Sequence, residues 1–87
     1  MDRIIIRGDV TALYQHLYVY QNGERVDCIG VLFEDLADTV LSCLNKYSLT
    51  RIDLSGSRFY MEGIEQEIKK AIALKYNSFP DITFKYV

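Results

Sequence analysis

Residues 14–33 read YQHLYVYQNGERVDCIGVLF, and the structure that this stretch adopts decides the fold. Asn22-Gly23, in its middle, strongly favours a two-residue type I′ turn, which needs a positive φ at both central positions. The flanking residues alternate between apolar and polar and are rich in tyrosine and valine, as β-strands are. The stretch therefore predicts a β-hairpin.

A two-residue turn also fixes the pairing of the two strands. Counting outward from the turn predicts the facing pairs Gln21 and Glu24, Tyr20 and Arg25, Val19 and Val26, Tyr18 and Asp27, and Leu17 and Cys28. One face of the hairpin would then carry Leu13, Leu17, Val19, Val26, Cys28 and Leu32. The other face would carry Tyr14, His16, Tyr18, Tyr20, Arg25 and Asp27.

A helix over residues 10–21 is the alternative interpretation of the same stretch. Helix spacing is matched by Val10, Leu13, Tyr14, Leu17 and Tyr18. Asp9 would be the N-cap and Asn22-Gly23 the C-terminal stop. The Tyr-Val-Tyr run and the consistent cross-strand pairs favour the hairpin.

The rest of the chain alternates between strand and helix patterns. We expect strands at Arg3–Arg7, Thr50–Leu54 and Asp81–Val87. Asp35 caps a predicted helix that ends at Lys46 or Tyr47, and a second predicted helix runs from about Arg58 to Tyr76, with Asn77 and Pro80 after it. The helical apolar stripes are Leu36, Val40, Cys43, Leu44 and Tyr47 in the first helix and Ile64, Ile68, Ala71, Ile72 and Tyr76 in the second. Gly63 lowers helix propensity, so the second helix could instead start near Glu62.

These elements predict one small globular α/β (α+β) domain over residues 1–87. Its element order is β-β-β-α-β-α-β, which gives a single five-stranded mixed sheet. Two helices are too few to cover both faces of such a sheet. We therefore expect both helices on one face, and a partly open second face that carries the tyrosines.

This element order, three strands followed by helix, strand, helix and strand, resembles the core of the ribonuclease H fold. The resemblance implies that the first three strands are antiparallel and the later ones parallel. Catalytic members of that family carry an aspartate inside the first strand. Here that strand is Arg3-Ile4-Ile5-Ile6-Arg7, and Asp2 and Asp9 lie only at its margins.

Composition limits the classes of partner. The chain is 49% hydrophobic with a net charge of −2, which indicates a globular protein and argues mildly against a partner held mainly by phosphate contacts. Seven tyrosines and no tryptophan are a heavy tyrosine load, and tyrosine is enriched at interfaces. No apolar run approaches the ~18 residues that a membrane span needs, and no signal peptide is visible.

The cysteines and the lone histidine show no metal-binding spacing. Cys28 and Cys43 form no CxxC motif, and each lies on a predicted apolar face, so we expect buried free thiols and a reducing cytoplasm. His16 lacks a second histidine or a metal motif nearby. We therefore expect no metal and no cofactor.

Residues 51–70, RIDLSGSRFYMEGIEQEIKK, contain the segment that most resembles a ligand site. Ser55, Gly56 and Ser57 form a turn before a helix, which can bind phosphate through backbone N–H groups. The turn lacks the second glycine and the lysine of a phosphate loop, so a plain strand-to-helix connection with Ser57 as N-cap is favoured. Phe59, Tyr60 and Met61 follow, and they either fill the core or meet a partner.

Two groups of polar residues suggest further functions. Asp9, Asp27 and Asp53 could bind Mg²⁺ if they converged, as a nuclease requires, but a solvated or salt-bridged sheet face is the favoured interpretation. Tyr14, His16, Tyr18, Tyr20 and Arg25 could form an aromatic and basic surface, with Arg3, Arg7 or Lys85 beside it. Such a surface could bind a protein, a second copy of the chain, or nucleic acid.

The main hypothesis is a non-enzymatic interaction domain that binds a protein through its open tyrosine-bearing face, with Phe59 and Tyr60 as further contacts. By analogy, such a protein would be a small inhibitor or accessory protein of a phage or mobile element. A nucleic-acid-binding module is the second hypothesis, and a divergent metal-dependent nuclease is the third.

Overall fold

A computed structural model describes residues 2–75 and 81–87. It contains five strands, β1 (Arg3–Arg7), β2 (Tyr14–Gln21), β3 (Glu24–Leu32), β4 (Arg51–Ser55) and β5 (Thr83–Tyr86). Its two helices are α1 (Phe33–Tyr47) and α2 (Arg58–Lys75). The predicted element order and the α+β class are therefore confirmed.

All five strands belong to one sheet, in the order β3-β2-β1-β4-β5. β2 pairs antiparallel with both β1 and β3, whereas β4 pairs parallel with both β1 and β5. This is the arrangement that the resemblance to the ribonuclease H core implied. The carboxyl ends of β1 and β4 consequently meet at one end of the sheet.

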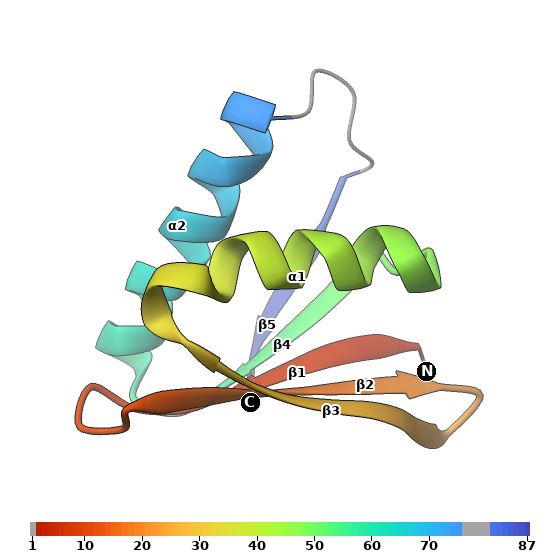
Figure 1. The fold of residues 1–87 in the computed structure, drawn as a ribbon, viewed down its shortest axis with the longest axis horizontal. Helices are drawn as coiled ribbons and strands as arrows, with labels where there is room; N and C mark the ends of the chain where they lie inside the picture. Colours follow the sequence, from red (N-terminus) through yellow and green to blue (C-terminus); the bar gives the residue numbers. More distant parts are fainter. Residues whose placement is uncertain (1, 76–80) are drawn as a thin grey trace.

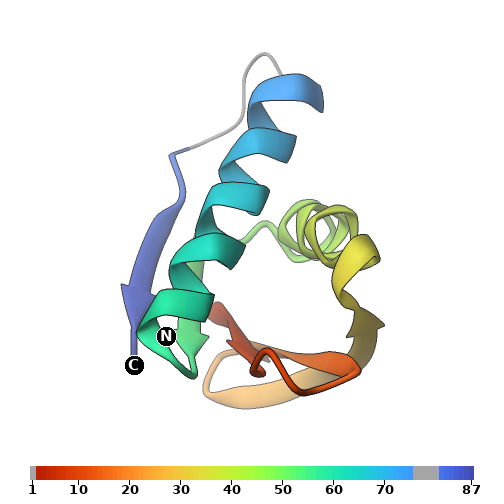
Figure 2. The same ribbon diagram turned by 90° about the vertical axis from the view of Figure 1, so that its left-hand side faces the viewer.

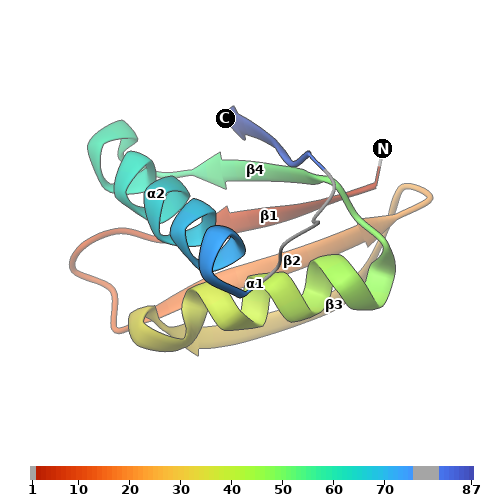
Figure 3. The ribbon, with the colours of Figure 1, turned by 90° about the horizontal axis from the view of Figure 1, so that it is seen from above.

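Both helices lie on the same face of the sheet, as Figures 1 and 3 show. The core lies between them and the sheet, because alternate strand residues such as Ile4, Ile6, Leu17 and Ile52 are fully buried there. On α1 the buried residues are Leu36, Val40, Leu41, Cys43 and Leu44, so the predicted stripe is confirmed except that Tyr47 is only half-buried and Leu41 joins it. On α2, Ile64 and Ile68 are fully buried, while Tyr76 of the predicted stripe lies outside the described residues. The opposite face of the sheet carries no helix.

The β2–β3 hairpin is confirmed, and the alternative helix over residues 10–21 is wrong. Asn22 and Gly23 have φ values of 55° and 79°, which is the type I′ geometry that the dipeptide favours. Val10 and Leu13, which the helix would have buried, are exposed.

The predicted register of this hairpin holds only next to the turn. Gln21 faces Glu24 and Tyr20 faces Arg25, but a β-bulge follows, and Val19 faces Asp27. Beyond it Tyr18 faces Cys28 and Leu17 faces Ile29, so the predicted pairs of Val19 with Val26, Tyr18 with Asp27 and Leu17 with Cys28 are wrong. The bulge has a physical reason. Without the bulge, Val26 would face the core, and strand alternation would make Cys28, Gly30 and Leu32 the other core-facing residues of β3.

With the bulge, the larger Ile29 and Val31 face the core instead. Cys28 moves to the open face and is exposed, so the prediction that it is buried is wrong, whereas Cys43 is buried as predicted. Asp27 moves to the helix side. There its carboxylate accepts hydrogen bonds from the Tyr47 hydroxyl at 2.9 Å and from the Cys28 backbone N–H at 2.9 Å.

The helix boundaries differ slightly from the prediction. α1 begins at Phe33, and its N-cap Leu32 makes no side-chain capping bond, so Asp35 is not the cap. The strand β3 runs directly into the helix, and Glu34 and Asp35 lie in its first turn, where the helix dipole favours carboxylates. α2 begins at Arg58, before Gly63 rather than at Glu62. The predicted stop at Asn77 and Pro80 lies outside the described residues.

β5 is fastened to α2 by a polar cluster. Tyr86 donates a hydrogen bond to Glu65, Lys69 forms an ion pair with Glu65 at 2.6 Å, and the Arg58 guanidinium lies 3.9 Å from the centre of the Tyr86 ring. The hydrogen bond to Glu65, together with burial, raises the pKa of Tyr86 to about 12. These contacts hold the edge strand against the helix.

Candidate functional site

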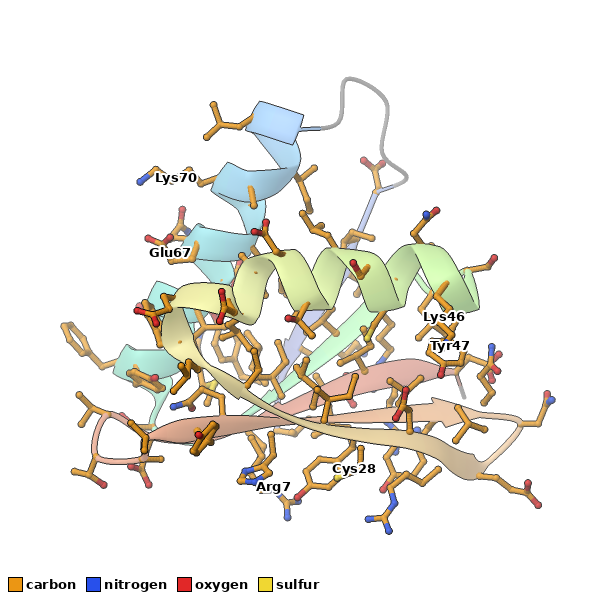
Figure 4. The ribbon with its side chains drawn as sticks, viewed as in Figure 1. Arg7, Cys28, Lys46, Tyr47, Glu67 and Lys70 are labelled. Carbon is orange, nitrogen blue, oxygen red and sulfur yellow. The ribbon has the colours of Figure 1, made fainter. Side chains whose placement is uncertain are left out.

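The sequence hypotheses concentrate on the sheet face opposite the helices, which we call the open face. Strand alternation puts Tyr14, His16, Tyr18 and Tyr20 of β2 on this face. Arg25 of β3 faces Tyr20 across the hairpin and joins them. Figure 4 shows Arg7 and Cys28 extending from the sheet on the side away from α1 and α2. The structure therefore gathers all five predicted surface residues on one face.

Guanidinium groups pack over two of the tyrosine rings. The Cζ atom of Arg3 lies 4.9 Å from the centre of the Tyr20 ring. Those of Arg7 and Arg25 lie 5.6 and 5.7 Å from the centre of the Tyr18 ring. These separations are within the roughly 6 Å of a cation–π contact. Tyr18, whose ring also stacks on His16 at 6.3 Å, is thus the centre of the cluster.

Asp53 is buried at the middle of the open face. Its carboxylate forms ion pairs with Arg3 at 3.2 Å and with Arg51 at 2.8 Å, and its side chain is only 5% exposed. A salt-bridged sheet face was the interpretation favoured for Asp53 from the sequence. The arginines are its partners, and Asp27 lies on the other side of the sheet. A buried carboxylate between two guanidinium groups fixes the positions of both arginines.

The open face concentrates positive charge on an acidic protein. Half of the ten lysine and arginine side chains lie there, namely Arg3, Arg7, Arg25, Arg51 and Lys85. Among the described strand residues, Asp53 is the carboxylate on that face. Within the described part of the chain, Arg7, Arg25 and Lys85 have no carboxylate partner. The net charge does not show this separation of cations from carboxylates, because the acidic residues lie mainly on the helices and loops.

The candidate metal and catalytic residues do not come together. Asp53 is on the open face, Asp27 is on the helix side, and Asp9 lies in the β1–β2 loop, where its Oδ1 accepts bonds from Thr11. In residues 2–75 and 81–87, no three His, Cys, Asp or Glu side chains are grouped as a metal site would require. His16 is exposed and stacks on Tyr18.

Gly56 of the Ser55-Gly56-Ser57 turn has a structural function. Its φ is +152°, and a Cβ atom added to it would lie 2.4 Å from the carbonyl oxygen of Gly8. Glycine is therefore required because the connection after β4 packs against the end of β1, where the Gly8 N–H also bonds Ser55 O at 3.3 Å. Phosphate binding by Ser55, Gly56 and Ser57 stays a prediction, since a packing contact already accounts for the glycine.

The three large residues that begin α2 have different environments. Met61 is fully buried and fills the core, Tyr60 is half-buried, and Phe59 is 88% exposed. The Tyr60 ring packs against Phe33 with 6.3 Å between ring centres. Burial, followed by the charge of Asp9, raises the pKa of the Tyr60 phenol. Phe59 and Tyr60 lie at the end of the molecule formed by the entrances of both helices, not on the open face.

Two residues of these surfaces were not predicted from the sequence. Arg51 was not assigned to the open face, although its place next to Ile52 in an alternating strand predicts it. The predicted hairpin includes Phe33 as its last residue, so the packing of Phe33 against Tyr60 was not expected. No local sequence pattern predicts a contact between the first turns of two helices.

Comparison with known proteins identifies no relative. Neither family models, nor curated proteins, nor solved structures give a match to this chain. Neither helix, over the part of the chain that the structure describes, has the length and apolarity to cross a membrane.

Proposed function

We propose that this protein is a non-enzymatic binding domain whose open face docks onto an acidic surface of a larger protein. One observation carries the proposal: tyrosines and arginines, the residue types that most often anchor protein interfaces, are concentrated on the sheet face that no helix covers. Three cations there, Arg7, Arg25 and Lys85, have no carboxylate partner among the described residues. An acidic partner would supply those carboxylates.

The packing of the rings supports a protein as the partner. Guanidinium groups already lie over Tyr18 and Tyr20, so a nucleic-acid base would have to displace them before it could stack. A carboxylate can instead bind the outer edge of the same guanidinium groups and leave these contacts intact. The buried Asp53 holds Arg3 and Arg51 in place, which reduces the side-chain entropy lost on binding.

The same charges favour a different protein over a second copy of this chain. A symmetric dimer through the open face would bring its unpaired cations close to those of the other subunit, and like charges repel. The proposed role is therefore that of an inhibitor or accessory protein that covers an acidic functional surface. The free thiols Cys28 and Cys43 fit a role in the reducing cytoplasm.

Affinity capture from a cell lysate, with the unaltered chain and with charge-reversed variants as baits, tests this proposal. Arg7→Glu combined with Arg25→Glu should lose a protein that the unaltered chain captures from nuclease-treated lysate. Lys70→Glu is the matched control, because Lys70 lies on α2 on the other side of the molecule (Figure 4). The proposal is wrong if no captured protein distinguishes the double variant from the control.

Single-stranded nucleic acid is the second candidate partner, favoured by the positive charge of the open face. Its binding should appear at about 50 mM salt in a gel-shift experiment and weaken steeply as salt rises. A shift that disappears in the Arg7→Glu, Arg25→Glu variant, without any protein captured, would replace the first candidate by this one.

A further inference from the structure

A second surface lies at the end of the molecule where the β1–β2 loop meets the entrances of α1 and α2. Figure 2 views the molecule from this end. The surface contains a groove of about 450 Å³, within the roughly 300–1,000 Å³ of ligand-binding clefts. Val10 of the loop, Phe33 of α1, and Phe59 and Tyr60 of α2 supply its apolar lining. Residues far apart in the sequence thus build one concave apolar site.

Most of the apolar side chains of the groove are exposed to solvent. Phe59 is 88% exposed, Val10 79% and Leu13 72%, and Phe33 and Tyr14 are also well exposed. Of the eight strongly exposed large apolar side chains among the described residues, Val10, Phe33 and Phe59 line this one groove, and Leu13 lies in the same loop as Val10. Contiguous exposed apolar patches of this kind mark interaction sites in proteins, whereas scattered single residues do not.

The charged groups of the groove all have one sign. Asp9 and Glu67 line it, and its described lining includes no lysine, arginine or histidine. Oδ1 of Asp9 accepts two hydrogen bonds from Thr11, one from its backbone N–H and one from its hydroxyl, and no cation pairs with this carboxylate among the described residues. These bonds also lower the pKa of Asp9, so the carboxylate is ionised at neutral pH. Glu67 forms no hydrogen bond or ion pair within the described chain.

We infer that this groove binds a short amphipathic segment of a partner protein that presents large apolar side chains flanked by lysine or arginine. The apolar side chains would fill the lining of Val10, Phe33, Phe59 and Tyr60, and the cations would pair with Asp9 and Glu67. The charge preference is opposite to that of the open face. The protein would then hold an acidic surface on one side and a basic apolar segment at one end.

A labelled model peptide tests the groove directly. The probe is a short fluorescein-labelled helix of leucine and lysine at helical spacing, with a leucine and glutamate peptide as its charge-reversed counterpart. Fluorescence anisotropy should show binding of the lysine peptide only. Phe59→Ala, and Asp9→Asn combined with Glu67→Gln, should each weaken binding about tenfold or more. Val10→Ser removes a second apolar side chain of the groove, in the loop and not in a helix, and should also weaken binding of the lysine peptide.

Matched controls lie elsewhere on the chain. Leu74→Ala removes an equally exposed apolar side chain, and Glu24→Gln removes a carboxylate at the β2–β3 turn. Both should bind the lysine peptide as the unaltered protein does. So should the Arg7→Glu, Arg25→Glu variant, which separates this inference from the proposed function of the open face. Urea unfolding should confirm that the groove variants are folded, because the substituted side chains are largely exposed.

Three results would overturn the inference. If the groove variants bound the lysine peptide as tightly as the unaltered protein does, the peptide would be attracted to the acidic helices in general and not to the groove. Binding of the unaltered protein to neutral phosphatidylcholine vesicles, lost in Phe59→Ala, would assign the patch to a membrane surface. A dimer in sedimentation equilibrium that Phe59→Ala dissociates would assign it to a second copy of the chain.

Discussion

At the scale of single residues, the close contact between Gly56 and Gly8 shapes the end of the molecule. Gly56 has a positive φ, and the Gly8 carbonyl oxygen occupies the space where a Cβ would lie. At Gly8 an added Cβ would lie 1.6 Å from Oε1 of Gln15, so the buried Gln15 side chain would have to move. These two glycines allow the connections after β1 and β4 to pack together, and that packing positions the entrance of α2 beside the β1–β2 loop.

Replacing glycine by alanine should therefore have opposite effects at two positions. Gly56→Ala should lower the free energy of unfolding by about 2 kcal/mol or more, because it combines backbone strain with an overlap against Gly8. Gly63→Ala should raise it by about 0.5–1 kcal/mol, since a Cβ there meets no atom within 4 Å and alanine favours a helix.

Urea unfolding followed by circular dichroism measures both changes on the same scale. Gly63→Ala is the matched control for Gly56→Ala, as both add a single methyl group within or just before α2. Equal stability of the two variants would contradict the assigned packing of Gly56.

At the scale of elements, local patterns predicted most of the fold. The Asn22-Gly23 turn, the β-branched residues of β1 and the helical stripes were sufficient to place every strand and helix. The bulge in β3 was not predictable from the turn alone. It depends on which of two pairings of β3 with β2, the regular one or the one shifted by one residue, places better core side chains on the helix side of the sheet. The bulge turns Ile29 and Val31 to the core in place of Cys28, Gly30 and Leu32, and which set packs better depends on the helices that cover the sheet.

The tyrosines of the open face were predictable, whereas Cys28 and Arg51 on the same face were not predicted. β2 alternates without interruption, so its tyrosines share a face whichever register β3 adopts. The end groove was not predictable, because Val10, Phe33 and Phe59 meet only through the tertiary arrangement of a loop and two helices. Sequence patterns report one element at a time and do not show which helix entrances converge.

Thiol labelling tests the bulge. Under native conditions one cysteine should react readily with a thiol reagent, because the bulge exposes Cys28, while Cys43 stays buried. Burial, followed by the charge of Asp27, also raises the pKa of the Cys43 thiol and slows its reaction further. Both thiols should react in denaturant.

The variant Cys28→Ser identifies the reactive thiol. It should abolish the fast native reaction and leave the reaction of Cys43 in denaturant. If the native protein showed no fast reaction, β3 would have the regular register with Cys28 inside, and the bulge would be refuted.

At the scale of the whole molecule, charge and apolar surface are segregated in a way that net charge and composition do not show. The open face carries five cations around three tyrosines, whereas exposed Val10, Phe33 and Phe59 line a groove at one end beside two carboxylates. A chain of 87 residues with a sheet covered on one side only thus leaves two chemically distinct surfaces available. Two such surfaces are what a protein needs to bridge or block other molecules.

Site-specific photocrosslinking in the host cell tests the central claim most directly. A photoreactive phenylalanine analogue would replace Tyr18 at the centre of the open face and, as the control, Lys70 on α2. The account predicts a covalent adduct with a protein at position 18, resistant to nuclease and absent at position 70. A nucleic-acid adduct at position 18, or the same protein adducts at both positions, would contradict it.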